Sequence, residues 1–320
     1  KALCEQKSAA QQAMDEALRL PEDLNAYLAA SESNHKGIYP GTEKTIVWAR
    51  PSRAPTPWSI VYIHGYSATR QEPYPLCERL ASRLGANIFY TRLTGHGQSG
   101  AELAKATVND LLNDTLEAVE IGKRLGERVI VIGTSCGGTL AAWLAGRPGN
   151  DDVMAYVLIS PAFGFSNPAS GLLTGPWGRE LAQFCYGGEF VRVAANLKEA
   201  EFWTTRYPPE GLVTPVLLAD LVRKSPLEKA RRPVLVIYSP QDRLLSREAT
   251  GQAFARLGSA VKKLAPLENS QTPESHVLAG NILAPDDTDR VADIIMDFIS
   301  GLAIETTEDA MSEGVANPPR

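Results

Sequence analysis

The uncharged stretch Val129–Gly146 constrains the fold more than any other part of this sequence. It runs 18 residues between Arg128 and Arg147, the minimum length for a helix that crosses a bilayer. It begins, however, with a β-branched run that ends at Ile132, and three glycines follow within the next six residues. β-branched residues favour strands, and glycines interrupt helices. The stretch therefore predicts a buried strand, a tight turn and a packed helix, and no integral membrane segment.

The same alternation of strand-like and helix-like segments extends over most of the chain. Apolar runs predict strands at 45–48, 59–63, 87–90, 128–132, 155–159, 234–238 and 260–266. Amphipathic spacing predicts helices at 74–84, 107–125, 136–146, 246–257 and 287–301. Short apolar strands that alternate with such helices are typical of a parallel sheet covered on both faces. We therefore expect an α/β fold with a mostly parallel central sheet.

The two ends of the chain depart from this pattern. Residues 1–36 predict an N-terminal helical extension, and residues 37–302 predict the α/β domain. Residues 303–320 are acidic and rich in small residues, with prolines near the end, so we expect a mobile tail. Because the sequence opens at Lys1 rather than Met, we expect that an upstream segment was removed. A cytoplasmic and an exported protein both stay open, as does the oligomeric state.

One internal stretch, at about 163–225, also breaks the alternation. Its first part, 163–207, holds nine aromatic residues in 45, against 14 in the other 275 residues. An aromatic-rich insertion between two strands predicts a cap over the sheet. Two interpretations stay open: aromatics such as Trp177, Phe184 and Trp203 line an apolar substrate pocket, or they form the core of the cap itself.

The turn Gly133-Thr134-Ser135-Cys136-Gly137 lies between the predicted strand 128–132 and the helix 136–146. It fits the G-x-S-x-G pattern, in which a serine at a strained strand-to-helix turn projects above the sheet. Side chains two residues before and after that serine would clash with the backbone, which explains the glycines. Cys136 is a rival nucleophile, but it would place Thr134 where a glycine is needed. We therefore predict Ser135 as the nucleophile.

A serine nucleophile needs a base and an acid that orients this base. Of four histidines, only His276 follows Ser135 in the chain. Asp242 stands where the predicted strand 234–238 ends, and the order serine, acid, histidine suits this kind of turn. Glu248 and Glu274 are weaker candidates for the acid. The negative charge that develops on the substrate's carbonyl oxygen (the oxyanion) needs two backbone N–H donors. We predict that Cys136 supplies one, and that Tyr66, in the loop after an early strand, supplies the other.

These residues together, with His64-Gly65-Tyr66 and Thr94–Ser99, resemble the α/β-hydrolase superfamily. The branch looks like the bacterial carboxylesterases and the lysophospholipase or monoacylglycerol-lipase-like enzymes. The resemblance covers about residues 43–302 and implies a serine hydrolase with a helical cap inserted after the sixth strand. Two features depart from this branch: Thr134 and Cys136 replace the usual His and Met, and the helices at 1–32 precede its usual start.

The resemblance implies cleavage of carboxylic esters through an acyl-enzyme intermediate. The expected substrate is a small-molecule ester with a small to medium apolar acyl chain; a lysophospholipid, a monoacylglycerol, an amide or a thioester stays an alternative. No cofactor or metal is expected. Four cysteines without CxxC spacing give no zinc or redox motif. The net charge is −5, and the acidic tail carries −3 of it, so nucleic acid is not expected as a partner.

Two other classes of function stay open. The segment Gly95–Gly100 matches the G-x-G-x-x-G pattern of dinucleotide-binding proteins, but the next predicted strand ends without the carboxylate that would hold a ribose. Alternatively, the chain is a catalytically silent binding protein that keeps the fold. The complete set of catalytic residue types favours an enzyme.

Overall fold

The computed structural model describes residues 20–314, and the side chains of residues 20–302. The helix expected over 1–32 is described only from Leu20 onward, as helix α2 (Leu24–Ser33). Cys4 also lies outside the described residues.

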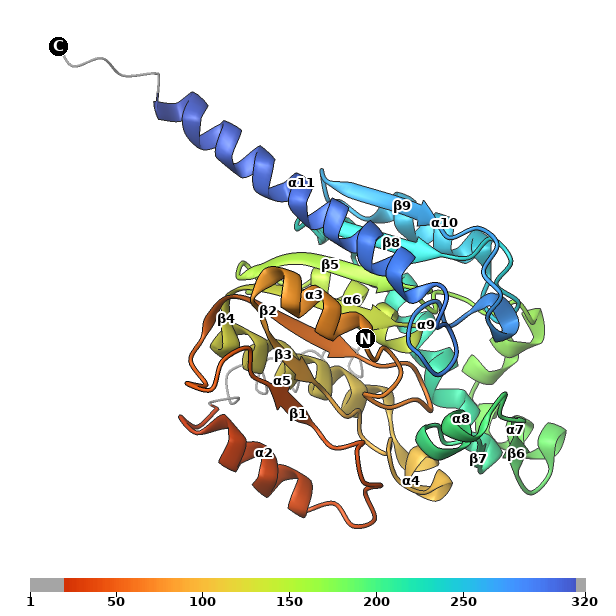
Figure 1. Ribbon diagram of the computed structural model, residues 1–320. Coiled ribbons are helices and arrows are strands. Elements are labelled where there is room, and N and C mark those ends of the chain that lie inside the picture. The colour runs from red at the N-terminus through yellow and green to blue at the C-terminus, as the bar shows by residue number, and fades with distance from the viewer. Residues whose placement is uncertain (1–19, 315–320) are drawn as a thin grey trace, which may run out of the picture.

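Seven strands form the central sheet, in the order β1-β3-β2-β4-β5-β8-β9 (Figure 1). β1 runs antiparallel to β3, and every other neighbouring pair is parallel. The strands span Thr45–Val47 (β1), Thr56–Ile63 (β2), Asn87–Tyr90 (β3), Gly126–Thr134 (β4), Val153–Ile159 (β5), Val234–Tyr238 (β8) and Lys262–Pro266 (β9). This confirms the predicted α/β fold with a mostly parallel sheet.

Helices cover both faces of the sheet, because alternate side chains of a strand point to opposite faces. Val61 and Ile63 of β2 belong to one buried cluster, and Ile60 and Tyr62 belong to the other. The first cluster includes side chains from α2, α5 (Val108–Leu125), α6 (Cys136–Ala145), α9 (Val213–Lys224) and α10 (Arg247–Arg256). The second includes side chains from α3 (Leu76–Leu84) and α11 (Thr288–Gly314).

The stretch Val129–Gly146 folds as β4, a turn and α6, as predicted. Its apolar residues are buried in the sheet and in the helix packed against it. Within the described residues, no helix combines the length and the apolar composition that a membrane span requires.

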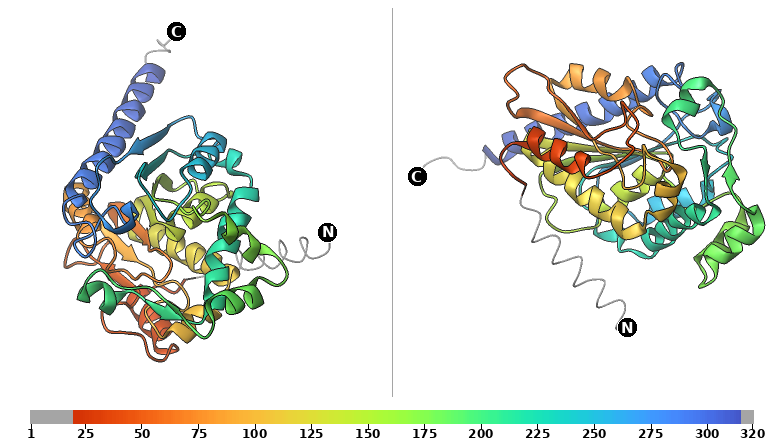
Figure 2. Two further views of the ribbon diagram at one scale, coloured as in Figure 1. Left: turned by 90° about the vertical axis from the view of Figure 1, so that its right-hand side faces the viewer. Right: turned by 90° about the horizontal axis from the view of Figure 1, so that it is seen from below.

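The insertion between β5 and β8 contains both helices and a small antiparallel pair of strands. Its elements are the 3-10 helix η1 (Pro168–Thr174), α7 (Gly178–Tyr186), β6 (Phe190–Val191), α8 (Leu197–Phe202), β7 (Arg206–Tyr207), the 3-10 helix η2 (Pro209–Leu212) and α9. Figure 1 shows α7, α8 and the β6–β7 pair gathered at one end of the molecule, and the right-hand view in Figure 2 agrees. The insertion follows β5, the fifth strand along the chain, whereas the resemblance implied a cap after the sixth. A single strand, β1, precedes β2 in the sheet.

Two helices differ from the predicted pattern. The short helix α4 (Gly100–Lys105) was not predicted; the residue before it, Ser99, caps it by accepting the Glu102 N–H with its side chain. Helix α11 runs to Gly314 rather than ending near 301, so it continues into the segment for which we expected a mobile tail.

Candidate active site

Ser135 stands at the sharp turn between β4 and α6. Its backbone dihedrals are φ 55° and ψ −118°, outside the regions that a side-chain-bearing residue normally adopts. Such strain costs about 1–3 kcal/mol and is found mainly at functional sites. Cys136 is already the first residue of α6, so Ser135, and not Cys136, occupies the strained position of the turn.

The two glycines of the motif are required by close backbone contacts. A Cβ on Gly133 would lie 2.2 Å from the Gly137 carbonyl oxygen. A Cβ on Gly137 would lie 1.9 Å from the Ile63 carbonyl oxygen at the end of β2. Contacts this short exclude any side chain at either position, as the sequence pattern predicts.

His276 and Asp242 are brought together by the loops that follow β9 and β8. The Nδ1 atom of His276 lies 2.8 Å from Asp242 Oδ2, and both side chains are more than nine-tenths buried. The other carboxylate oxygen, Oδ1, accepts the backbone N–H groups of Leu244 and Leu245 at 2.8 and 2.9 Å. These bonds fix the carboxylate, and we infer that His276 carries its proton on Nδ1 because ionised Asp242 can only accept.

The end of β5 connects Ser135 with this pair. The Ile159 carbonyl accepts the Ser135 N–H at 2.9 Å, and the next residue, Ser160, donates its hydroxyl to the His276 carbonyl at 2.7 Å. Since β4, β5, β8 and β9 are parallel, the residues that follow them meet at the same edge of the sheet. Ser135, Asp242 and His276 therefore lie at one edge, as their positions in the sequence predict.

The two weaker carboxylate candidates lie elsewhere. Glu248 is exposed in α10, where it accepts from Gln252. Glu274 pairs with Arg243 at 3.2 Å. Glu274 and Ser275 both have positive φ, 56° and 50°, so the turn before His276 is strained as well.

The loop after β2 carries Tyr66, whose backbone N–H we predicted to face the oxyanion. The Tyr66 hydroxyl donates to the Gly211 carbonyl in the insertion at 2.6 Å, and its ring contacts His96 and Tyr207 edge-on. Cys136 is buried, and burial raises the pKa of its thiol to about 12 although the Tyr66 N–H lowers it. The thiol is therefore protonated at neutral pH, which disfavours it as a nucleophile.

His64 and His96 are buried and hold the loops that carry them. His64 Nδ1 lies 2.9 Å from the Gly65 carbonyl, and His64 Nε2 accepts the Leu93 N–H at 3.1 Å. His96 Nδ1 lies 3.0 Å from the Thr94 carbonyl. Burial lowers the pKa of both imidazoles, so they are neutral structural groups.

The glycines of the segment Gly95–Gly100 face protein atoms rather than open space. A Cβ on Gly95 would lie 2.6 Å from the Glu102 carbonyl oxygen, and a Cβ on Gly100 would lie 2.1 Å from the Arg206 carbonyl oxygen. Packing against the chain itself thus explains these glycines, without the close approach of a dinucleotide phosphate.

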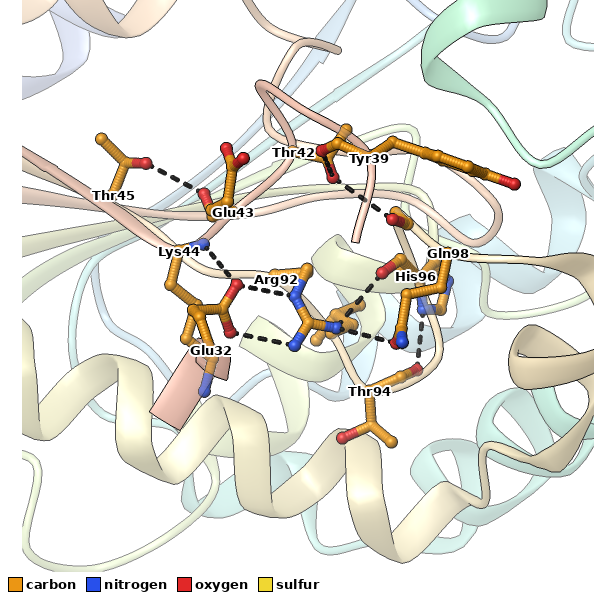
Figure 3. Close-up of polar contacts among 12 residues, drawn as sticks. Glu32, Tyr39, Thr42, Glu43, Lys44, Thr45, Arg92, Thr94, His96 and Gln98 are labelled. Carbon is orange, nitrogen blue, oxygen red and sulfur yellow. Dashed lines mark hydrogen bonds and ion pairs between the residues drawn. The ribbon is translucent and has the colours of Figure 1, made fainter. Parts of the chain in front are cut away.

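Helix α2 is anchored to this same loop by a buried ion pair (Figure 3). Glu32 accepts two hydrogen bonds from the Arg92 guanidinium, each 2.9 Å. Arg92 is 2% exposed, and it also donates to the His96 carbonyl and to the Gln98 side chain. Helix α2 lies before the part of the chain that resembles the family. It therefore supports the loop that contains His96, which the Tyr66 ring contacts.

We expect Glu32→Ala to lower the free energy of unfolding by about 3–5 kcal/mol, because it leaves the buried Arg92 charge unpaired. Burial raises the pKa of Glu32, but the hydrogen bonds and charge of Arg92 outweigh it and keep the pKa below its usual value. The stabilisation is thus present at neutral pH and is lost as the pH falls through that lowered pKa. Urea unfolding at pH 7.5 and pH 3.5 measures both effects.

Glu102→Ala is the matched control for this variant, because Glu102 pairs with Lys105 at the surface. We expect a loss of at most about 1 kcal/mol. Equal losses in the two variants would contradict the anchoring role of Glu32.

The three aromatics predicted for a substrate pocket lie in different surroundings. Trp177 and Phe184 are 73% and 88% exposed. Phe184 borders an open cavity of about 540 Å³ whose other lining residues are polar: Arg179, Glu180, Gln183 and Glu210. Trp203 is 7% exposed and packs with Ala68, from the loop after Tyr66, and with Leu283. Trp203 alone of the three is therefore buried beside the candidate site.

The architecture defines the protein as an α/β-hydrolase, the superfamily that the sequence resembles. The model of one family, described as serine aminopeptidase S33, matches residues 54–270, and the chain belongs to this family. No three His, Cys, Asp or Glu side chains are arranged to hold a metal ion among the described residues.

One relative is similar to this chain in sequence, and solved structures are similar to it in fold. A thermostable monoacylglycerol lipase from Bacillus sp. (strain H-257) is 26% identical over 220 residues, which cover 67% of this chain and 82% of the lipase. A structure from work on the metagenome-derived lipolytic enzymes LipS and LipT has a TM-score of 0.62 at 21% identity, and covers 82% of this chain and 99% of its own. A soluble variant of monoglyceride lipase from Saccharomyces cerevisiae has a TM-score of 0.63 at 14% identity, with coverages of 81% and 91%.

Proposed function

We propose that this protein is a serine hydrolase of carboxylic esters, with Ser135 as the nucleophile. His276 acts as the general base and Asp242 as the acid that orients it. The observation that carries the proposal is the buried hydrogen bond between His276 and Asp242, at the edge of the sheet where the strained Ser135 turn also lies. A nucleophile, a base and an oriented acid in one place are the parts that acyl transfer requires.

In the first half of the reaction, Ser135 Oγ attacks the ester carbonyl and His276 Nε2 takes the hydroxyl proton. The imidazolium then donates this proton to the leaving alcohol, which leaves an acyl-enzyme. Asp242 stabilises the imidazolium, since its carboxylate keeps the Nδ1 proton in place. In the second half, His276 activates a water molecule that releases the acid.

The negative charge that develops on the carbonyl oxygen is assigned to two backbone donors. One is the N–H of Cys136, at the positive end of the α6 dipole. The other is the N–H of Tyr66. Together they form an oxyanion hole, which typically contributes about 2.7–4 kcal/mol per donor to transition-state stabilisation.

We propose an ester with an apolar acyl chain of small to medium length as the substrate. Support comes from the buried Trp203, which packs beside the loop that carries Tyr66, and from the lipases and lipolytic enzymes to which the chain is similar. Monoacylglycerol is the second candidate, because one relative is named a monoacylglycerol lipase and the cap exposes large apolar side chains such as Phe184.

Hydrolysis should depend on acyl chain length if apolar residues bind the chain. We expect kcat/KM to rise by up to about fourfold per methylene from acetate to a medium-chain ester, since each buried methylene contributes about 0.8 kcal/mol. The measurement is a series of p-nitrophenyl esters from C2 to C16, with 1-monoacylglycerols and an aminoacyl p-nitroanilide beside it.

Trp203→Ala should flatten this chain-length profile and leave acetate hydrolysis nearly unchanged. Trp177→Ala is the comparison, because Trp177 is exposed and should affect the profile less. Equal losses on every ester in Trp203→Ala would mean that this residue only supports the fold.

A fluorophosphonate probe tests whether the protein is an enzyme at all. If the probe labels no residue, this result would favour the catalytically silent binding protein.

A further inference from the structure

A buried carboxylate that the proposed mechanism does not use lies between the Tyr66 loop and the nucleophile turn. Glu72 is 3% exposed and lies between β2 and α3. No pattern in the sequence indicated this residue, since a carboxylate in the polar stretch Arg70-Gln71-Glu72-Pro73 is typical of an exposed loop. A buried, ionisable side chain of this kind is costly unless its contacts compensate, so its contacts indicate what it does.

Glu72 contacts both loops that we assign to catalysis. Its Oε2 atom accepts the backbone N–H of Gly65 at 2.8 Å, so it holds the residue directly before Tyr66. The same oxygen accepts the Tyr62 hydroxyl at 2.8 Å. The Tyr62 oxygen lies 2.8 Å from the hydroxyl of Thr134, the residue directly before Ser135.

Gly65 is enclosed between Glu72 and the nucleophile. A Cβ on Gly65 would lie 2.9 Å from Glu72 Oε1 and 3.4 Å from Ser135 Cβ. The backbone of Glu72 also touches the loop that carries His276, because a Cβ on Gly280 would lie 1.9 Å from the Glu72 carbonyl oxygen. One residue is therefore in contact with the Tyr66 loop and the His276 loop, and is linked to the Ser135 turn through Tyr62.

We propose that Glu72 is a positioning residue for the oxyanion hole. Its carboxylate fixes the His64–Gly65 peptide by accepting the Gly65 N–H, and through Gly65 it sets the direction of the next N–H, that of Tyr66, toward the carbonyl oxygen of the substrate. Through Tyr62 it fixes Thr134 and with it the second donor of the hole. This inference rests on the proposed function of the site.

The charges around Glu72 make its role visible in the pH dependence of the reaction. The titratable groups that act on it or share its surroundings are Tyr62 of β2, Cys136 of α6 and His276. Burial raises the pKa of Glu72 to about 7, while the Gly65 N–H, the Tyr62 hydroxyl and His276 lower it. Glu72 is thus ionised above about pH 7, and its change of charge at lower pH contributes to the acidic limb of the pH profile.

The test compares Glu72→Ala and Glu72→Gln with the wild type on p-nitrophenyl butyrate, with rates expressed per active site titrated by a fluorophosphonate. Glu72→Ala should lower kcat by about 10–100-fold and change KM by less than about threefold, as expected when a transition-state donor is misplaced. Glu72→Gln keeps an acceptor for Gly65 and Tyr62 and should restore kcat to within about threefold. Its acidic limb of kcat/KM should shift to lower pH by about half a unit or more.

Glu78 provides a matched control. It also accepts a tyrosine hydroxyl, from Tyr90 at 2.7 Å, but none of its hydrogen bonds reaches Gly65 or Thr134. Glu78→Ala and Glu78→Gln should leave kcat per titrated site and the pH profile unchanged, whatever they do to the melting temperature.

The outcomes separate the two proposals. If the wild type hydrolyses no ester and takes up no fluorophosphonate, the proposed function fails first. If the wild type is active but Glu72→Ala keeps full kcat per titrated site, or Glu72→Gln leaves the pH profile unmoved, Glu72 is a structural residue only and the inference is overturned. If Glu72→Ala does not fold, the Glu72→Gln pH profile alone decides.

Discussion

Replacing Ser135 with alanine is expected to lower hydrolysis of p-nitrophenyl butyrate by about 10⁴–10⁶-fold, with the fold intact. Loss of a triad nucleophile removes covalent catalysis. Only substrate binding and stabilisation by the oxyanion hole then accelerate the reaction. The methyl group of alanine fits the turn at least as well as the serine side chain, so circular dichroism and the melting temperature should change little. Steady-state kinetics with purified variants, together with loss of fluorophosphonate labelling, measure the effect.

Cys136→Ala is the control for this prediction, because the two residues are neighbours and only the backbone N–H of Cys136 is assigned a role. We expect this variant to keep activity within about tenfold of the wild type, since a small buried side chain is shortened and no donor is lost. An active Ser135→Ala together with an inactive Cys136→Ala would falsify the assignment of the nucleophile.

The strands and helices that frame the site were predictable because local patterns specify them. The apolar run Val234–Tyr238 gave the observed bounds of β8, and Asn87–Tyr90 gave those of β3. The turn at Ser135 was predictable for a different reason. A Cβ on either of its glycines would lie 1.9–2.2 Å from a backbone oxygen, and this steric constraint requires glycine at two positions of the sequence.

Other parts of the site depend on contacts between segments far apart in the chain, which local patterns do not record. The ion pair of Glu32 with Arg92 joins residues 60 positions apart. Glu72 looks like a surface carboxylate until β2 and the Ser135 turn are packed around it. The sequence likewise cannot tell an exposed aromatic such as Phe184 from a buried one such as Trp203, because the cap is too short to show a clear period.

The position of the insertion shows what a family resemblance can and cannot supply. The resemblance implied a helical cap after the sixth strand, whereas the cap follows β5 and includes the β6–β7 pair. The resemblance concerns the order of catalytic residues along the chain, and this order holds for any number of strands before β2. Ser135, Asp242 and His276 follow β4, β8 and β9, so neither the number of strands before β2 nor the structure of the cap alters their order.

The acid of the proposed triad offers the second large effect. Asp242→Asn is expected to lower kcat by about 10⁴-fold at pH 7–8, although the side chain keeps its shape. The amide can donate to His276 Nδ1, which would place the imidazole proton on Nε2. A histidine with that proton cannot accept the hydroxyl proton of Ser135, and it also loses the charge that stabilises the imidazolium.

Glu274→Gln is the matched control, because Glu274 is an exposed carboxylate two residues before His276 that pairs with Arg243. We expect its kcat to stay within about threefold of the wild type, since a surface ion pair contributes at most about 1 kcal/mol. The two variants are to be compared across pH 6–10 on the same ester. If Glu274→Gln loses as much activity as Asp242→Asn, or if Asp242→Asn keeps most of its kcat, then the hydrogen bond between Asp242 and His276 does not orient the base, and the acid of the site has to be sought elsewhere.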